Sequence, residues 1–180
     1  MSITAYNASV PVMITVLTNM KAWLDKAAAH KDEAELIEAR LAPDMYPLAK
    51  QVQLVSDSAK GCGARLAGVE APSMPDTEAS FAELKERCDK TIAFLESLDP
   101  SAVEAGIAKE IELKFPNGGG MRFDGLTYLN GFVLPNVYFH ASMLYAILRA
   151  AGVDIGKLDF LAHLGPNVFP PPENAAGIRA

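Results

Sequence analysis

One stretch without a charged side chain, Gly125–Leu148, constrains the fold of this chain more than any other feature. It is long enough to span a bilayer. It also contains residues that are poorly suited to contact with lipid, namely Asn130, Gly131, Pro135, Asn136, His140 and Ser142. Because 50% of the chain is hydrophobic and 21% is charged, the composition is that of an ordinary soluble domain. We therefore predict a loop followed by the central helix of a soluble bundle, and no membrane association.

From Pro135 to Gly152 the sequence has the three-and-four spacing of a helix with a buried stripe. One helical face contains Val133, Asn136, Val137, His140, Leu144, Ile147, Leu148 and Ala151. The opposite face is also apolar, so we expect this helix to be covered on most sides, and Gly152 to end it. Asn136 and His140 lie one turn apart within the stripe, so they require hydrogen-bond partners or a ligand.

Further apolar stripes with the 3.6-residue period precede this helix, over residues 8–29, 45–68 and 76–98, with short helical turns at 33–41 and 100–105. We expect Pro11 in the first turn of the first helix, where a missing N–H is tolerated. Helix starts are predicted at the capping residues Asp44, Asp76 or Thr77, and Asp99. Four long amphipathic helices predict an all-α fold, a four-helix bundle, with residues 1–180 forming a single domain.

Alternation of apolar and charged residues replaces the helical period at about residues 111–124. A turn at residues 116–120 interrupts it, so we predict a small β-hairpin that is inserted before the last long helix and acts as a flap over one end of the bundle. The glycines of this turn lack the Lys-Ser/Thr pair that a phosphate-binding loop requires. The tail at about residues 165–180 is rich in proline and glycine, which predicts an extended C-terminal arm.

Charge and cysteine content exclude several classes of function. A net charge of −6, with a pI near 5.1, disfavours a nucleic-acid-binding surface. Cys62 and Cys88 each lie in an apolar stripe and form neither a disulfide framework nor a zinc motif, so we expect free buried thiols. The N-terminus lacks the basic start and apolar core of a signal peptide, which favours a cytoplasmic location.

Four blocks of sequence support a family resemblance: RLAPDMYPLAKQVQLVSDSAKG, RLAG, FAELKER and LPNVYFHASMLYAILRAAGVDIGKLDFL. Together they resemble an uncharacterised bacterial family that is classed as a domain of unknown function. That family is similar to the DinB/YfiT-like bundles, many of which are putative metalloenzymes with three histidine ligands. The resemblance implies the same helical bundle, and pairing of related bundles implies a homodimer through helix faces.

The resemblance carries over only part of a metal site. It implies two histidines four residues apart on the last long helix; the second matches His140, but Asn136 stands at the position of the first. A third ligand would come from the second helix, where Gln51 or Gln53 occupies the neighbourhood. One imidazole with two neutral amides would hold zinc or nickel weakly, because an amide oxygen has no charge to replace the hydration of the ion.

Three interpretations of His140 remain open at this stage. In the first it is a core histidine that bonds Asn136, Gln51 or a backbone carbonyl. In the second, which we adopt, His140, Asn136 and the two glutamines, Gln51 and Gln53, bind a small organic molecule at a degenerate metal site. In the third the protein is a metal-dependent hydrolase or transferase that uses His140 as a metal ligand or acid/base.

Several other side chains are candidates for the same site. His163 is a second imidazole, and Asp44 or Asp57 would supply a carboxylate if it faced the interior. The walls of a small-molecule pocket would comprise Tyr138, Met143 and Tyr145.

Overall fold

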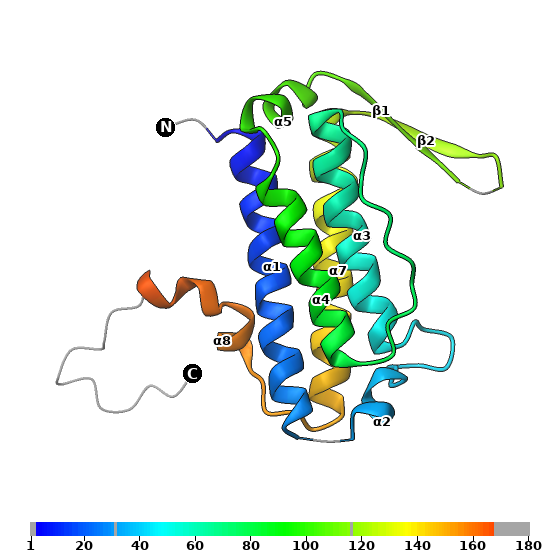
Figure 1. The fold of residues 1–180 in the computed structure, drawn as a ribbon, viewed down its shortest axis with the longest axis vertical. Helices are drawn as coiled ribbons and strands as arrows, with labels where there is room; N and C mark the ends of the chain where they lie inside the picture. Colours follow the sequence, from blue (N-terminus) through cyan, green and yellow to red (C-terminus); the bar gives the residue numbers. More distant parts are fainter. Residues whose placement is uncertain (1–2, 31, 116, 168–180) are drawn as a thin grey trace.

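The computed structural model describes residues 3–30, 32–115 and 117–167. Its long helices pack side by side in a bundle (Figure 1), and they are α1 (Ala5–Ala28), α3 (Leu48–Ala67), α4 (Phe81–Glu96) and α7 (Leu134–Ala150). The shorter helical segments are α2 (Glu33–Ile37), α5 (Pro100–Gly106), α6 (Gly125–Thr127), the π-helix η1 (Tyr128–Val133), α8 (Lys157–Phe160) and the 3-10 helix η2 (Ala162–Asn167). The predicted helical bundle with an inserted hairpin is confirmed.

The predicted apolar stripes form the shared core of the bundle. The fully buried side chains include Val10, Met13, Leu17, Met20 and Leu24 of α1, Val52, Val55 and Leu66 of α3, Leu84 and Leu95 of α4, and Val137, Leu144 and Leu148 of α7. Each large aliphatic side chain removed from water contributes about 1.5–3 kcal/mol of burial free energy. Cys62 and Cys88 are free thiols within this core, as predicted, and burial raises the pKa of each to about 12.

The starts of the first two long helices differ from the sequence prediction for local reasons. The first helix begins at Ala5, capped by Thr4, so Pro11 lies in its second turn and not its first. Helix α3 begins at Leu48 and not at residue 45, because Pro47 disfavours helical geometry at the residue before it. Asp44 therefore lies in a turn and does not cap.

The start of α4 also differs from the prediction, because the cap is Ser80. The Ser80 hydroxyl accepts the Glu83 N–H at 3.2 Å, so the helix begins at Phe81, and Asp76 and Thr77 belong to the preceding loop. The cap predicted at Asp99 is confirmed, with its carboxylate accepting the Ser101 N–H at 3.0 Å.

The segment before α7 is helical, where the sequence predicted a loop. In the π-helix η1 the chain is wound more widely, and the Leu134 N–H bonds the carbonyl of Leu129, five residues back. The wide turn stands directly before Pro135, which has no N–H to donate to a regular helix. Gly152, with a φ of 92°, ends α7 as predicted.

The outer face of α7 is not covered, contrary to the sequence prediction. One face packs against α1 and α3, while Tyr138 is 42% exposed and Phe139 is 53% exposed. By length and composition alone, Gly125–Ala150 would suffice to cross a membrane, and the core helix of a soluble bundle meets the same criteria. The homodimer predicted through helix faces stays a prediction, and this is the apolar face that it would use.

The hairpin pairs β1 (Glu110–Lys114) with β2 (Gly120–Asp124) in antiparallel register, as predicted. It runs outward from the end of the bundle at which α5 lies (Figure 1). Ile111 and Leu113 point inward and are buried. At its base the backbone of Gly125 lies against the carbonyl of Gly106, where a Cβ atom would clash. Part of the predicted turn, residue 116, lies outside the described residues.

The chain after α7 folds back along α1. The Trp23 indole N–H donates to the Asp159 carbonyl at 3.1 Å, and the Asn19 amide donates to the Phe160 carbonyl at 2.9 Å. The rings of Trp23 and Phe160 stack with their centroids 5.1 Å apart. Of the predicted C-terminal arm, residues 165–167 belong to η2, and residues 168–180 lie outside the described residues.

Candidate functional site

Helix α3 carries polar side chains on two opposite sides. Each residue of an α-helix is rotated by about 100° from the one before it, so Gln53 points about 200° away from Gln51. Gln51 and Ser58 face α7, where each bonds a side chain of that helix. Gln53 instead faces α4 and the loop of residues 69–80, where its amide donates to Glu78 at 2.9 Å. The two predicted glutamines therefore belong to different environments.

His140 is held by a chain of hydrogen bonds that fixes which ring nitrogen carries the proton. The Gln51 amide N–H donates to the Tyr46 carbonyl at 3.0 Å, which directs the Gln51 Oε1 oxygen toward the imidazole. His140 Nδ1 lies 2.8 Å from that oxygen. Because an amide oxygen only accepts, Nδ1 must be the donor, and in the neutral ring Nε2 keeps the lone pair.

The Nε2 atom of His140 is the chemically available part of this ring. The residue is 9% exposed, and Nε2 makes no hydrogen bond to the described part of the chain. Within that part, no buried side-chain nitrogen or oxygen lacks a partner, so Nε2 must touch solvent. Burial lowers the pKa of His140 from 6.5, so the ring is neutral at pH 7. The arrangement is a neutral imidazole with its acceptor nitrogen facing outward.

Asn136 lies one turn before His140 on α7 and bonds a second residue of α3. Its amide N–H donates to the Ser58 hydroxyl at 2.7 Å. The Asn136 Oδ1 oxygen makes no hydrogen bond to a described residue, and so by the same reasoning it touches solvent. The structure thus brings together three of the four predicted site residues, Gln51, Asn136 and His140, at the contact between α3 and α7.

On the other side of α3, Arg87 is the centre of a charged network that the sequence analysis did not identify. Arginine is usually a surface residue, but Arg87 is only 2% exposed. Its guanidinium contacts Asp57 at 2.7 Å, and Asp76 and Glu78 at 2.9 Å each. Its burial could have been predicted from its position in the sequence, because it lies three residues after Leu84, within the apolar stripe of α4.

The network is balanced in charge and joins three segments of the chain. Lys50 pairs with Asp76, and Lys60 pairs with Asp57, so three cations face three carboxylates. Burial alone would raise the pKa of the Asp76 carboxyl, but pairing with Lys50 and Arg87 outweighs it and lowers the pKa from 3.8. Burial likewise opposes the lowering of the Glu78 pKa from 4.5, which the Arg87 hydrogen bond produces. These contacts tie the loop of residues 69–80 to α3 and α4.

The donors around His140 do not fit a three-ligand metal centre. The described residues contain no group of three His, Cys, Asp or Glu side chains that could hold an ion. Of the predicted alternatives, Asp57 is paired with Arg87 and Lys60, and His163 lines a separate crevice beside α1. What remains at His140 is one imidazole with an amide and a hydroxyl nearby, a set that would bind zinc or nickel weakly.

The side chains that were predicted to line a pocket at His140 lie in different parts of the structure. Tyr145 packs against Trp23, with the ring centroids 5.8 Å apart, on the side of α7 that faces α1. Tyr138 lines the crevice beside α1 that also contains His163. Phe139, which the sequence analysis did not single out as a site residue, makes an edge contact with the His140 ring at 5.1 Å.

Comparison with known proteins agrees with this architecture. Residues 5–161 match the model of a family described as "Domain of unknown function (DUF1993)". The chain belongs to this family. A similar solved structure is that of a DinB family member protein from Shewanella denitrificans. It has 35% sequence identity and a TM-score of 0.78, over 87% of this chain and 90% of that chain. No curated protein matches at a significant level.

The DUF1993 and DinB matches confirm the predicted family resemblance. The chain is therefore a DinB-like member of a family without an assigned function. The chemistry that the site can perform follows from the residues of this chain, in particular from the oriented His140.

We expect NMR to detect the oriented, neutral state of His140. The ¹⁵N spectrum of the ring should report a protonated Nδ1 at pH 7, with a titration midpoint below 6.5 because burial opposes the charged form. Since the unfolded state binds the proton more readily, this residue should lower stability as the pH falls below 6.5. His140→Gln should remove that part of the pH dependence, and His163→Gln should retain it. A midpoint above 6.5 would contradict the burial argument.

Removing the centre of the charged network should destabilise the fold. Arg87→Met leaves three carboxylates with only two cations, Lys50 and Lys60, and we expect a loss of about 3 kcal/mol in the free energy of unfolding by urea. The matched change Lys90→Met, at an exposed position on the same helix, should alter it by less than about 0.5 kcal/mol. The lowered pKa values of Asp76 and Glu78 stabilise the native state above pH 4.5, and this contribution is lost in acid as these groups protonate. Equal stability of the two variants would show that the network does not hold the loop.

Proposed function

We propose that this DinB-like protein binds a small, uncharged organic molecule at His140, and that its Nε2 atom accepts a hydrogen bond from the ligand. The observation that carries the proposal is the chain from the Tyr46 carbonyl through the Gln51 amide to the Nδ1 hydrogen. It holds the imidazole in one tautomer and directs an acceptor toward solvent. Small-molecule sites characteristically contain a few polar groups whose fixed positions orient the ligand.

The charge state of the site supports an uncharged ligand. The imidazole is neutral at pH 7, and the groups beside it, Gln51, Asn136 and Ser58, carry no formal charge. An ionic ligand would lose hydration on binding without gaining an opposite charge. A ligand that has an O–H or N–H group can donate its hydrogen to Nε2, because the other ring nitrogen, Nδ1, is already bonded to Gln51. Asn136 Oδ1, one turn away, offers a second acceptor to such a ligand.

The proposal is tested with phenol and anisole, two uncharged probes of similar shape, of which only phenol donates a hydrogen bond. Titration followed by protein NMR should give a saturable shift of the His140 ring ¹⁵N signals with phenol. Anisole should bind at least about fivefold more weakly, the effect of one hydrogen bond worth about 1 kcal/mol. His140→Phe should abolish the difference between the probes, and His163→Phe should preserve it. Equal binding of both probes to the wild type would overturn the proposal.

A second candidate is the metal-dependent enzyme, hydrolase or transferase, that the family resemblance implies. One observation favours it: a histidine whose Nδ1–H is held by an oxygen acceptor presents Nε2 in the manner of many metal ligands. An ion at Nε2 would lie away from Gln51, whose oxygen accepts the Nδ1–H, so of the predicted residues only Asn136 would be left to assist it weakly.

Metal analysis separates the two candidates. Protein purified without a histidine tag and dialysed against micromolar zinc or nickel chloride should retain less than one equivalent of either metal. His140→Ala should leave that small amount unchanged, because a lone imidazole contributes little affinity. Stoichiometric metal in the wild type that disappears in His140→Ala would favour the enzyme over the binding protein.

A further inference from the structure

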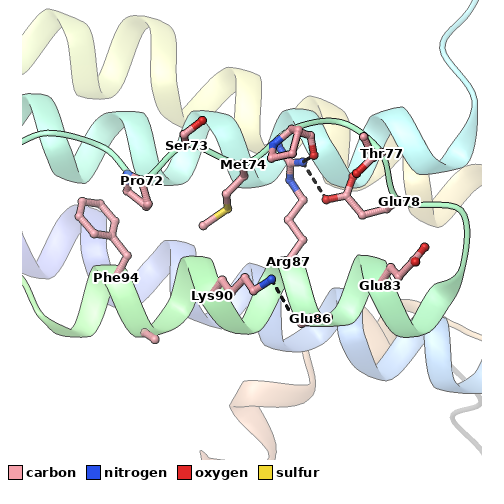
Figure 2. A pocket seen from close by; sticks show the side chains of 12 residues that line it. Pro72, Ser73, Met74, Thr77, Glu78, Glu83, Glu86, Arg87, Lys90 and Phe94 are labelled. Carbon is pink, nitrogen blue, oxygen red and sulfur yellow. Dashed lines mark hydrogen bonds and ion pairs between the residues drawn. The ribbon is translucent and has the colours of Figure 1, made fainter.

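A cavity lies on the opposite side of α3 from His140. It occupies about 580 Å³ between the loop of residues 69–80 and α4 (Figure 2), a volume typical of small-molecule sites. The loop forms one wall and α4 forms the other. The residues that line it include Pro72, Met74, Glu78, Glu83, Arg87 and Phe94.

The two ends of this cavity differ in polarity. At one end Phe94 of α4 lies across from Pro72 of the loop, and Met74 extends from the loop toward α4 beside them (Figure 2). Methionine has a flexible and polarisable side chain, so it adapts to ligands of different shape. At the other end lie the carboxylates of Glu78 and Glu83. The cavity therefore suits a molecule with an apolar body and one polar group.

The net charge at the polar end of the cavity depends on which charged side chains already pair with a side chain of opposite charge. Arg87 is surrounded by three carboxylates, one of which is Glu78, and Lys90 pairs with Glu86 at 2.8 Å. Among the described residues no cation pairs with Glu83. One of its oxygens accepts the Ala79 N–H at 2.6 Å. The charges on the cavity wall sum to −1, and Glu83 carries the unmatched one.

We propose that this cavity binds a primary amine with a long apolar body, with the ammonium group at Glu83 and the far end of the body between Pro72 and Phe94, a span of about 16 Å along α4. An ammonium group complements the unmatched carboxylate, whereas a carboxylate ligand would meet net negative charge. This site is separate from the one proposed above, because His140, Gln51 and Asn136 do not line the cavity. Its ligand class is also different, a cation in place of a neutral molecule.

Three probes with the same phenyl end and an eight-carbon chain, long enough to reach from Phe94 to Glu83, test the sign of the charge: 8-phenyloctylamine, 8-phenyloctan-1-ol and 8-phenyloctanoate. We expect saturable amide shifts on α4 and residues 72–78 with the amine. The alcohol should bind roughly three- to fivefold more weakly, the effect of one partly exposed ion pair. The carboxylate should bind more weakly still. Absence of saturable shifts with the amine, or binding of the anion as tight as that of the amine, would overturn the proposal.

Variants then assign the two ends of the cavity. Glu83→Gln keeps an oxygen that can accept the Ala79 N–H, so it preserves the helix start, and it should reduce amine affinity to that of 8-phenyloctan-1-ol. Phe94→Leu, a mild change chosen to retain the fold, should weaken the amine and the alcohol by a similar factor. Glu96→Gln, an exposed change on α4 outside the cavity, is the matched control and should leave all affinities unchanged. Unaltered amine binding in Glu83→Gln would contradict the assignment of the ammonium site.

Discussion

Helix α3 has packed neighbours on both sides, and the rest of the structure depends on every polar group that it buries having a partner. An unpaired polar group in such a position costs about 1–3 kcal/mol, a large share of the stability of a domain. Toward α7 the partners are neutral, His140 for Gln51 and Asn136 for Ser58. Toward α4 they are ionic, with Arg87 at the centre. Among the described residues, no buried side-chain nitrogen or oxygen lacks a hydrogen-bond partner.

This division is the basis of the two different kinds of binding site that we propose on one small bundle. The neutral side holds an imidazole in a single tautomer and leaves one acceptor for a ligand. On the ionic side the internal charges cancel, so the field at the neighbouring cavity comes from the remaining carboxylate, Glu83. Each side thus discriminates by a different physical property, hydrogen-bond donation in one case and charge in the other. Such discrimination depends on buried partners that are fixed before a ligand arrives.

The sequence predicted the long helices well because their apolar spacing is a local property, and a stripe such as that of α1 needs no knowledge of its neighbours. Helix starts were less accurate, since Asp76 is a good capping residue but its carboxylate pairs with Arg87, a contact made only in the folded chain. The burial of Arg87 has the same origin, because its carboxylate partners belong to α3 and to the loop of residues 69–80. The pairing of His140 with Gln51 was among the predicted alternatives. The separation of Gln53 from Gln51 followed from helix geometry alone and was overlooked.

The wide turn that precedes Pro135 has a consequence for the whole end of the bundle. A π-turn accommodates one residue more than an α-turn, so it rotates everything upstream by about 100° about the helix axis relative to α7. The aromatic rings of Phe123, Tyr128 and Phe132 pack together in that rotated frame with their centroids 5.8–6.1 Å apart; Tyr128 and Phe132 are stacked, and Phe123 is tilted against both. The extra residue therefore sets the angular phase between the hairpin and the histidine-bearing face. A relative with a shorter segment here would carry its hairpin in a different direction, even with an unchanged core.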